Sequence, residues 1–182
     1  RLYIANTDYD WYSFLLRQSD LDEANFWRPS GKQVVGYLNF GDPFIFKLKS
    51  EHRHAIVGFG FFVAFAQLSV REAWETFGEK NGAASLDAMW QRVSRYAYRT
   101  AHQPYDARHP VGCDLIASPI FFPTDLWIEG PADWSKNIVT GSGNYDASHG
   151  EGRRIWQACM ERAAMLGPAV PVAAEQGEVI AP

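Results

Sequence analysis

The clearest hydrophobic pattern of the chain lies in residues 41–65, where it predicts a β-hairpin at the centre of a small twisted β-barrel. Apolar and polar side chains alternate along residues 44–49 with a period near two, as in a half-buried strand. A polar loop then leads to a second apolar run, 55–65, which contains Gly58 and Gly60. Glycine within a strand usually marks a bulge, a tight bend or the close approach of another group. We therefore interpret this second strand as the floor of a pocket that the two glycines keep open.

Shorter patterns along the chain predict a mixed α+β fold in which helices flank the barrel. Apolar residues recur at helical spacing in four segments, and Ser69 with Glu72 forms a capping box at the start of one of them. The two central helices make a helical insertion at 69–101. The stretches 25–31 and 131–145 are expected to be irregular, because residues that break regular structure occur in both. Helices are expected at 10–16, 71–77, 86–101 and 150–165, and further strands at 2–6, 32–38, 111–122 (with a break at Ser118-Pro119) and 126–128.

The composition indicates one folded domain followed by a linker. Hydrophobic residues make up 47% of the 182 residues, which is enough for a packed core. We assign residues 1–166 to the domain, and 167–182 to a linker toward a further, C-terminal domain, because the latter are rich in Pro, Ala, Val and Gly. No apolar run is long enough to span a bilayer, and the first residues do not resemble a signal peptide. Two distant cysteines fit a reducing compartment, so a cytoplasmic location is expected.

Charge and aromatic content indicate what the domain binds. The net charge of -4 argues against indiscriminate binding of nucleic acid, although Arg92, Arg95 and Arg99 share one face of a predicted helix. That row is either a solvated face or a set of phosphate contacts. Aromatic residues make up 15% of the chain and include seven Trp, more than a core of this size needs. Trp27, in the predicted loop 25–31, is either a cover over the core or one wall of a ligand site.

Catalytic motifs are not evident in the sequence. There is no P-loop, no GxGxxG after a strand, no GxSxG elbow and no HExxH. His52 and His54 have no further ligands at metal-site spacing, and Asp114 and Glu129 do not form a recognisable nuclease cluster. A small metal-dependent hydrolase or nuclease that uses these residues stays an alternative. Excess aromatics beside polar loops and a basic side are better suited to hold a base extruded from nucleic acid, because aromatic rings stack on bases while Arg and Lys contact phosphates.

Several segments, taken in order, resemble PUA-superfamily domains of the EVE, YTH and SRA-like kind. An opening strand, a D-x-W helix, a Trp-containing loop, a GD turn and an IVGFG strand follow one another as in those domains. More closely, RLYIANTDYDWYSFL, NFWRPSG, FGDPFIFKLKS, AIVGFGFF, AWETFGEKNGA and PADWSKNIV resemble the N-terminal part of bacterial HNH endonucleases of the modification-dependent restriction type. The likeness covers about residues 2–165. It implies a PUA-like fold and a specificity module of a type IV-like restriction enzyme, which recognises a modified base in double-stranded DNA by flipping it into an aromatic pocket.

The resemblance also implies where the base and the DNA backbone bind. In EVE and YTH domains the pocket is lined by the end of the first strand, the Trp-bearing loop and the strand after the GD turn. Transferred by order along this chain, Trp27 stacks on the base, with Phe26 or Trp74 opposite. The base-binding residues are then Asn6, Asp8, Asn25, Phe26, Trp27, Ser30 and Trp74, and the backbone contacts are Arg28, Lys47, Lys80, Arg95 and Arg99.

Partners and cofactors follow from the same resemblance. The expected partner is double-stranded DNA with a modified base. A homodimer is one of the states expected for the full-length protein. No cofactor or metal is expected in this domain, whereas a divalent metal belongs to the HNH nuclease expected beyond the linker. The sequence leaves open whether 5-methylcytosine, 5-hydroxymethylcytosine or N6-methyladenine is read, because each fits an aromatic slot. A reader of RNA or modified RNA is the main alternative, since related folds serve RNA.

Overall fold

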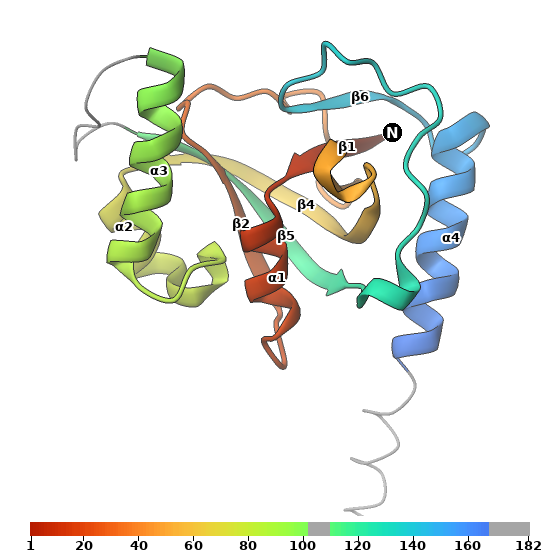
Figure 1. The fold of residues 1–182 in the computed structure, drawn as a ribbon, viewed down its shortest axis with the longest axis horizontal. Helices are drawn as coiled ribbons and strands as arrows, with labels where there is room; N and C mark the ends of the chain where they lie inside the picture. The colour runs from red at the N-terminus through yellow and green to blue at the C-terminus, as the bar shows by residue number, and fades with distance from the viewer. Residues whose placement is uncertain (102–109, 168–182) are drawn as a thin grey trace, which may run out of the picture.

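Six strands form one twisted sheet in the order β2-β5-β4-β3-β1-β6. The computed structural model describes residues 1–101 and 110–167 of the chain (Figure 1). β1 runs parallel to β3, and the other neighbouring strands are antiparallel. The strands are β1 (Leu2–Thr7), β2 (Glu23–Arg28), β3 (Pro43–Leu48), β4 (Ile56–Leu68), β5 (Val111–Phe121) and β6 (Gly141–Tyr145).

The four predicted α-helices are confirmed and flank this sheet. The predicted capping box is present, because the Glu72 amide donates to Ser69 Oγ at 3.1 Å and the Ser69 amide donates to Glu72 Oε1 at 3.1 Å. The helical insertion after β4 lies at one side of the sheet in Figure 1, and the last helix lies at the opposite side. No helix in the described part of the chain has the length and apolarity needed to cross a membrane. The helices are α1 (Tyr9–Leu16), α2 (Val70–Phe77), α3 (Leu86–Ala101) and α4 (Gly150–Leu166), with a 3-10 turn, η2 (Gly78–Asn81), between α2 and α3.

The sheet is open, so the mixed α+β class is confirmed but the expectation of a closed barrel is wrong. β2 and β6 are its two edges, and within the described residues they do not pair with each other. Both edges are short. β2 stops before Pro29, which has no N–H for a strand ladder, and β6 consists of five residues, two of them glycine. The linker assigned to residues 167–182 lies outside the described residues except for its first residue.

The central hairpin of β3 and β4 is confirmed, but Gly58 and Gly60 make room for the neighbouring strand β5. Gly41, with a φ of 88°, lies in the turn before β3. A Cβ atom on Gly58 would overlap the carbonyl oxygen of Ile120 in β5, and a Cβ atom on Gly60 would overlap the Ile116 side chain. The two glycines therefore let β4 and β5 approach closely. The interpretation that they keep a pocket floor open is wrong.

The predicted break at Ser118-Pro119 is a bulge inside one continuous strand. Ser118 adopts a φ of 50°, and the pairing of β5 with β4 shifts register between Phe59 and Phe61, opposite this point. A bulge bends a strand without ending its pairing. β5 therefore continues past the bulge to Phe121.

Two segments near the start of the chain differ from the sequence prediction. The stretch 25–31 was expected to be a loop, but β2 extends through most of it, and the breaking residues Pro29 to Gly31 come after the strand. Residues 32–38 were expected to be a strand, but they form bends and turns. Their apolar residues Val35 and Leu38 are buried, so they anchor an irregular segment on the core.

Two predictions for the region of residues 126–145, one of a strand and one of an irregular stretch, also fail. β6 lies at the end of the stretch predicted to be irregular. Its sequence GSGNY has a low strand propensity, which explains the wrong prediction, but the segment pairs with β1. The predicted strand at 126–128 is reduced to a single bridge between Ile128 and Ile56. Pairing with strands distant in the sequence decides both cases, so the local sequence could not predict them.

Three apolar clusters join these elements. The first lies on the inner face of the sheet, where α1 packs against side chains of β1 to β5. Eight of its buried side chains are aromatic; for example, the Trp11 ring lies 5.2 Å from Phe26 and 5.1 Å from Phe46, centroid to centroid. The second cluster joins α4 to the outer face, and the third packs α2 and α3 on the outer face of β5.

Lys47 is fully buried in β3. Its ammonium group donates to the Leu48 carbonyl at 2.8 Å, lies 2.9 Å from His54 Nδ1, and stands 4.5 Å from the centroid of the Trp134 ring. Burial, with a smaller contribution from the charge of nearby Lys49, lowers the pKa of Lys47 to about 8. The charged form of this side chain therefore opposes folding at neutral pH.

We expect Gly58→Ala to lower the free energy of unfolding by about 1–3 kcal/mol, the usual cost of overpacking. The added methyl group meets the Ile120 carbonyl, which belongs to the paired backbone of β5. Urea unfolding followed by circular dichroism measures the change. Gly36→Ala is the matched control, because a Cβ there meets only Gln33 atoms, the nearest at 3.6 Å, and should change stability by about 0.5 kcal/mol at most. Equal stabilities for the two variants would contradict the prediction.

We expect the wild type to gain stability relative to Lys47→Met as the pH rises above about 8. The folded-state pKa is about 8 and the ordinary value is 10.5, so between them the unfolded chain binds the proton better than the folded protein does. Stability then rises with pH by about 1.4 kcal/mol per unit. Urea unfolding from about pH 7 to pH 9.5 tests this, with the exposed Lys136→Met variant as control. Parallel profiles for wild type and Lys47→Met would show that the buried amine does not titrate in this window.

Candidate functional site

A pocket of about 340 Å³ opens where the two edges of the sheet fail to meet. One side comes from the end of β2 and the residues after it. The other side comes from the end of β1 and from residues 139–140, just before β6. We call this gap the seam and its cavity the seam pocket. The same absence of closure that makes the barrel prediction wrong therefore leaves an apolar pocket at the seam.

Half of the lining residues were predicted from the sequence. Alternation along β2 directs Phe26 and Arg28 toward the inner face, whereas Trp27 packs against both the inner cluster and the helical insertion. Asn6 is one residue before the end of β1, and Asp8 follows that strand directly. The predicted residues that line the seam pocket are Asn6, Asp8, Phe26, Trp27, Arg28 and Ser30.

The other half was missed by sequence reasoning. Trp11 is buried in the core and also borders the pocket. Tyr96 comes from α3, so the insertion does supply a wall, but from a helix face that sequence spacing did not single out. The unusual length of the stretch 131–145 was the one signal for residues 139–140. The missed residues are Trp11, Pro29, Lys49, Tyr96, Val139 and Thr140.

Hydrogen bonds fix the aromatic side chains of the pocket. The Trp11 indole donates to the Asn25 carbonyl at 3.2 Å, and the Trp27 indole donates to the Asn81 carbonyl at 2.9 Å. Trp11 is 4% exposed and Trp27 is half-buried, so Trp11 lies deep and Trp27 lies nearer the surface. Rings held in this way form a rigid apolar slot with little left to order when a flat ligand enters.

Charged groups at the pocket occur as two ion pairs. Lys49 Nζ lies 2.7 Å from Asp8 Oδ1 and 5.5 Å from the centroid of the Tyr96 ring, and both partners of this pair are partly exposed. Arg28 and Asp114 form the second pair, which is buried: its side chains are 7% and 0% exposed. Burial raises the pKa of Asp114 to about 6, and the adjacent Arg28 opposes that rise. The pocket is therefore formally neutral, with Lys49 as a partly exposed cation at its rim.

Asn6 is held by the segment that leads to β6. Its Nδ2 donates to the carbonyls of Val139 at 2.9 Å and Ile138 at 3.2 Å. The Asn6 Oδ1 atom is buried and has no hydrogen-bond partner among the described residues. Val139 itself is 82% exposed and lies among the residues that line the pocket.

The remaining predicted base-binding residues lie away from the seam pocket. Asn25 is fully buried and points toward the insertion, where its Nδ2 donates to Asn81 Oδ1 at 2.8 Å. Trp74 packs at the edge of the cluster between α2, α3 and β5. Neither side chain lines the pocket, so the structure does not bring the predicted opposite wall, Trp74, against Trp27.

The predicted phosphate contacts have different surroundings. Lys47 is fully buried, and Lys80 is engaged by Asp22 at 2.9 Å and Glu23 at 3.2 Å. Arg95 is exposed on α3, next to Tyr96. The side chain of Arg99 lies outside the described part of the structure. Of this set, Arg95 is placed as a surface phosphate contact requires, and Lys47 is not.

The residues of the hydrolase alternative do not come together. His52 stacks on Tyr9 with ring centroids 4.3 Å apart, and Asp114 is tied to Arg28. Across the described residues, no three His, Cys, Asp or Glu side chains gather closely enough to hold a metal ion. The exposed Glu129 lies in the segment beside α4.

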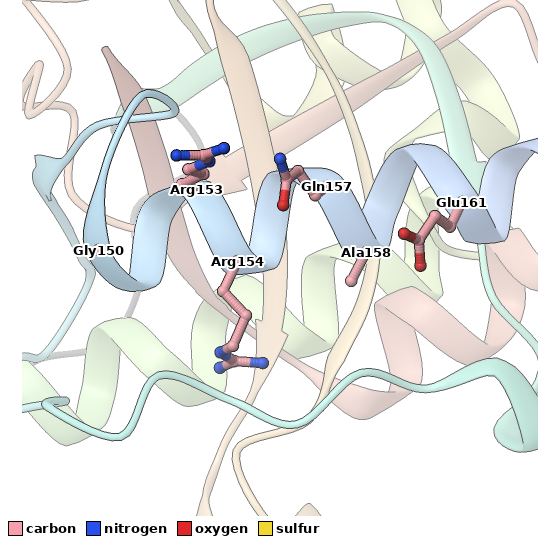
Figure 2. A pocket seen from close by; sticks show the side chains of 6 residues that line it. All are labelled: Gly150, Arg153, Arg154, Gln157, Ala158 and Glu161. Atoms are coloured by element: carbon pink, nitrogen blue, oxygen red, sulfur yellow. The ribbon is translucent and has the colours of Figure 1, made fainter.

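A second hollow, of about 390 Å³, lies over α4 (Figure 2). All of its lining residues belong to that helix, and Figure 2 shows Arg153 and Arg154 pointing to opposite sides of it. Arg154 is paired with Glu151 at 2.5 Å and donates to the carbonyls of residues 129 and 130 at 3.0 Å. The hollow is thus a groove along one helix surface, and its central arginine is already bound within the protein.

Comparisons with known proteins give a limited result. No protein-family model and no curated protein sequence matches the chain. The crystal structure of ASCH from Zymomonas mobilis is similar at 11% identity, covering 69% of this chain and 76% of that one with a TM-score of 0.43. A mutant of the same protein gives 10% identity, 66% and 75% coverage and a TM-score of 0.42. Because these scores are low, the function proposed below rests on the seam pocket itself.

Proposed function

We propose that this chain is a nucleic-acid-binding module that takes one unstacked base into the seam pocket. The observation that carries the proposal is an open slot of about 340 Å³ whose walls are Trp11, Phe26, Trp27 and Tyr96. Stacking of a base on aromatic side chains contributes roughly 1–3 kcal/mol per base, and unstacking a base from a duplex costs a few kcal/mol. Several aromatic walls are therefore the feature that such a site requires.

The rim of the pocket supplies the other groups that base extrusion needs. Lys49 lines the pocket and Arg95 lies on the exposed surface of α3, and we propose that each contacts a phosphate. Val139 projects from the opposite side, and an exposed apolar side chain is the kind that fills the space left in a base stack. The acidic net charge makes binding depend on the pocket more than on bulk electrostatics.

Our more specific proposal is that the base is a modified one in double-stranded DNA. The support is the resemblance of the ordered segments to the N-terminal part of modification-dependent HNH endonucleases, in which a nuclease domain uses such a module for specificity. A modified RNA is the competing ligand, because an unstacked base has the same aromatic faces in RNA. The 2′-hydroxyl and the A-form geometry distinguish the two, so matched DNA and RNA ligands separate these functions.

We expect the chain to bind duplexes with one modified base about 10- to 100-fold more tightly than the unmodified duplex, and Trp27→Ala and Tyr96→Ala to abolish the difference. Each variant removes one stacking wall. Fluorescence anisotropy at fixed salt measures the affinities for cytosine, 5-methylcytosine, 5-hydroxymethylcytosine, adenine and N6-methyladenine at the same position. The same bases in RNA form the second arm.

Trp74→Ala is the matched control for this experiment. It also removes a partly buried tryptophan, but Trp74 does not line the pocket, so the preference for a modified base should remain. Circular dichroism confirms that each variant is folded. Equal binding of plain and modified duplexes by the wild type would overturn the proposal, and stronger binding to the RNA series would replace DNA by RNA.

We expect Arg95→Gln to weaken binding to all duplexes by a similar factor and to leave the preference for a modified base unchanged. A phosphate contact adds affinity without reading sequence, and its loss reduces the slope of log K against log salt by about 1. Titrations at several salt concentrations measure that slope. Arg153→Gln is the control, because Arg153 is an exposed arginine on α4, at the opposite side of the sheet (Figure 1). A salt slope that is unchanged in Arg95→Gln would exclude this contact.

A further inference from the structure

Two consecutive residues of the helical insertion contact both tryptophans of the seam pocket. The backbone carbonyl of Asn81 accepts a hydrogen bond from the Trp27 indole at 2.9 Å. Gly82, the next residue, lies so close to Trp11 that a Cβ atom on it would overlap Cδ1 of the indole ring. Trp11 and Trp27 both line the pocket. This dipeptide therefore fixes two of the four aromatic walls from one point of the chain.

The side chain of Arg92, in α3, holds the dipeptide from the next helix. Arg92 is partly buried, and its Nη1 donates to the carbonyl oxygen of Gly82 at 2.6 Å. Arg92 and Tyr96 are four residues apart on α3, so they lie on the same face of that helix. Tyr96 is a third aromatic wall of the pocket. The hydrogen bond thus joins the helix face that carries Tyr96 to the residue that packs against Trp11.

The surroundings of Arg92 differ from those of Arg95, its neighbour in the arginine row of α3. The sequence allows this row to be either a solvated face or a set of phosphate contacts. Arg95 is exposed, whereas the guanidinium of Arg92 donates to a backbone carbonyl within the protein. A hydrogen bond from a charged donor is stronger than one between neutral groups. Arg92 therefore has a partner inside the insertion, which separates its role from that of a surface phosphate contact.

We propose that Arg92 is a positioning residue, which holds the aromatic walls of the seam pocket in place through Gly82 and thereby determines how well the pocket discriminates between bases. The inference rests on the proposed function, because base discrimination is its readout. A rigid slot loses little freedom when a flat base enters, whereas a loosened slot has to be ordered by the ligand. That ordering opposes the state with a base in the pocket and leaves binding through phosphates alone unchanged. Loss of the hydrogen bond therefore lowers the preference for the base that fits.

Two arginines on one helix give a matched test. Arg92→Gln is too short to reach the Gly82 carbonyl from the same backbone position, and Arg95→Gln removes an exposed arginine three residues away. Anisotropy titrations use duplexes with 5-methylcytosine, 5-hydroxymethylcytosine or N6-methyladenine and the matching unmodified duplexes. We expect Arg92→Gln to lower the preference for a modified base about 3- to 10-fold, and Arg95→Gln to leave it unchanged. Arg92→Lys keeps a charged donor and should restore part of the preference.

A pair of glycines tests the same contact from the other partner. Gly82→Ala adds a methyl group that meets the Trp11 ring, at a residue whose φ is 74°. Gly78→Ala, at the start of η2, is strained as well, with a φ of 53°, but its Cβ atom meets no described atom within 4 Å. Both variants should lose stability in urea unfolding, and only Gly82→Ala should lower the preference. If Gly82→Ala does not fold, the three arginine variants decide the question.

The indole N–H signals of the pocket report the positioning without a ligand. The Trp11 and Trp27 indoles donate to the carbonyls of Asn25 and Asn81, so their chemical shifts depend on these hydrogen bonds. Assigned ¹⁵N–¹H correlation spectra of the free protein measure them. We expect Arg92→Gln to shift both signals, and Arg95→Gln to leave them close to their wild-type positions.

The outcomes distinguish this inference from the proposed function. A wild type that binds plain and modified duplexes equally would overturn the proposed function and this inference with it. A wild type that prefers a modified base, with a folded Arg92→Gln or Gly82→Ala that keeps the full preference, would overturn the inference alone. Equal losses in Arg92→Gln and Arg95→Gln would do the same, because the loss of charge would then explain both. A lower preference in Arg92→Gln without a shift of the two indole signals would also overturn it.

Discussion

The seam between β2 and the β1–β6 edge is the constraint on which the rest of the structure depends. Strand edges carry unpaired N–H and C=O groups and expose the inner face of a sheet, so an open sheet must cover that face by other means. Here α1 inserts Trp11 beneath the gap, and Phe26 packs against it with ring centroids 5.2 Å apart. The cover is incomplete at the ends of β1 and β2. A closed barrel would have paired these two edges and removed the pocket.

The helical insertion converts this gap into a defined site. Asn81, at the end of η2, is fully buried and accepts from both the Asn25 amide at 2.8 Å and the Trp27 indole at 2.9 Å. Its own amide donates to the carbonyls of Ala73 at 3.0 Å and Gly78 at 2.8 Å. One residue therefore ties α2 and η2 to β2 and fixes the orientation of Trp27. Because α3 follows directly, the same anchor places Tyr96 on the far side of the pocket.

The sequence predicted those features that depend on local patterns, and it failed where distant segments decide. The central hairpin, the four helices and the Ser69 cap follow from periodicity and capping residues that lie within a few positions of one another. β6 and the open seam depend on pairing between residues more than a hundred positions apart, for which a five-residue Gly-rich segment gives no local signal. The site divides in the same way. Asn6, Phe26 and Trp27 were found through their order along the chain, whereas Tyr96 and Val139 reach the pocket only through tertiary packing.

Two buried cations show how structure separates a residue that serves folding from one that serves binding. Lys47 has a carbonyl, an imidazole nitrogen and an indole ring around its ammonium group, and its pKa is lowered as expected for a group that the protein has enclosed. Arg28 donates to one carboxylate through Nη2, and its Nε and Nη1 are unpaired among the described residues, although it lies beside a pocket. The sequence places both among candidate phosphate contacts, because composition distinguishes neither burial nor partners. The partners do: the ammonium group of Lys47 has partners within the protein, whereas two nitrogens of Arg28 have none among the described residues.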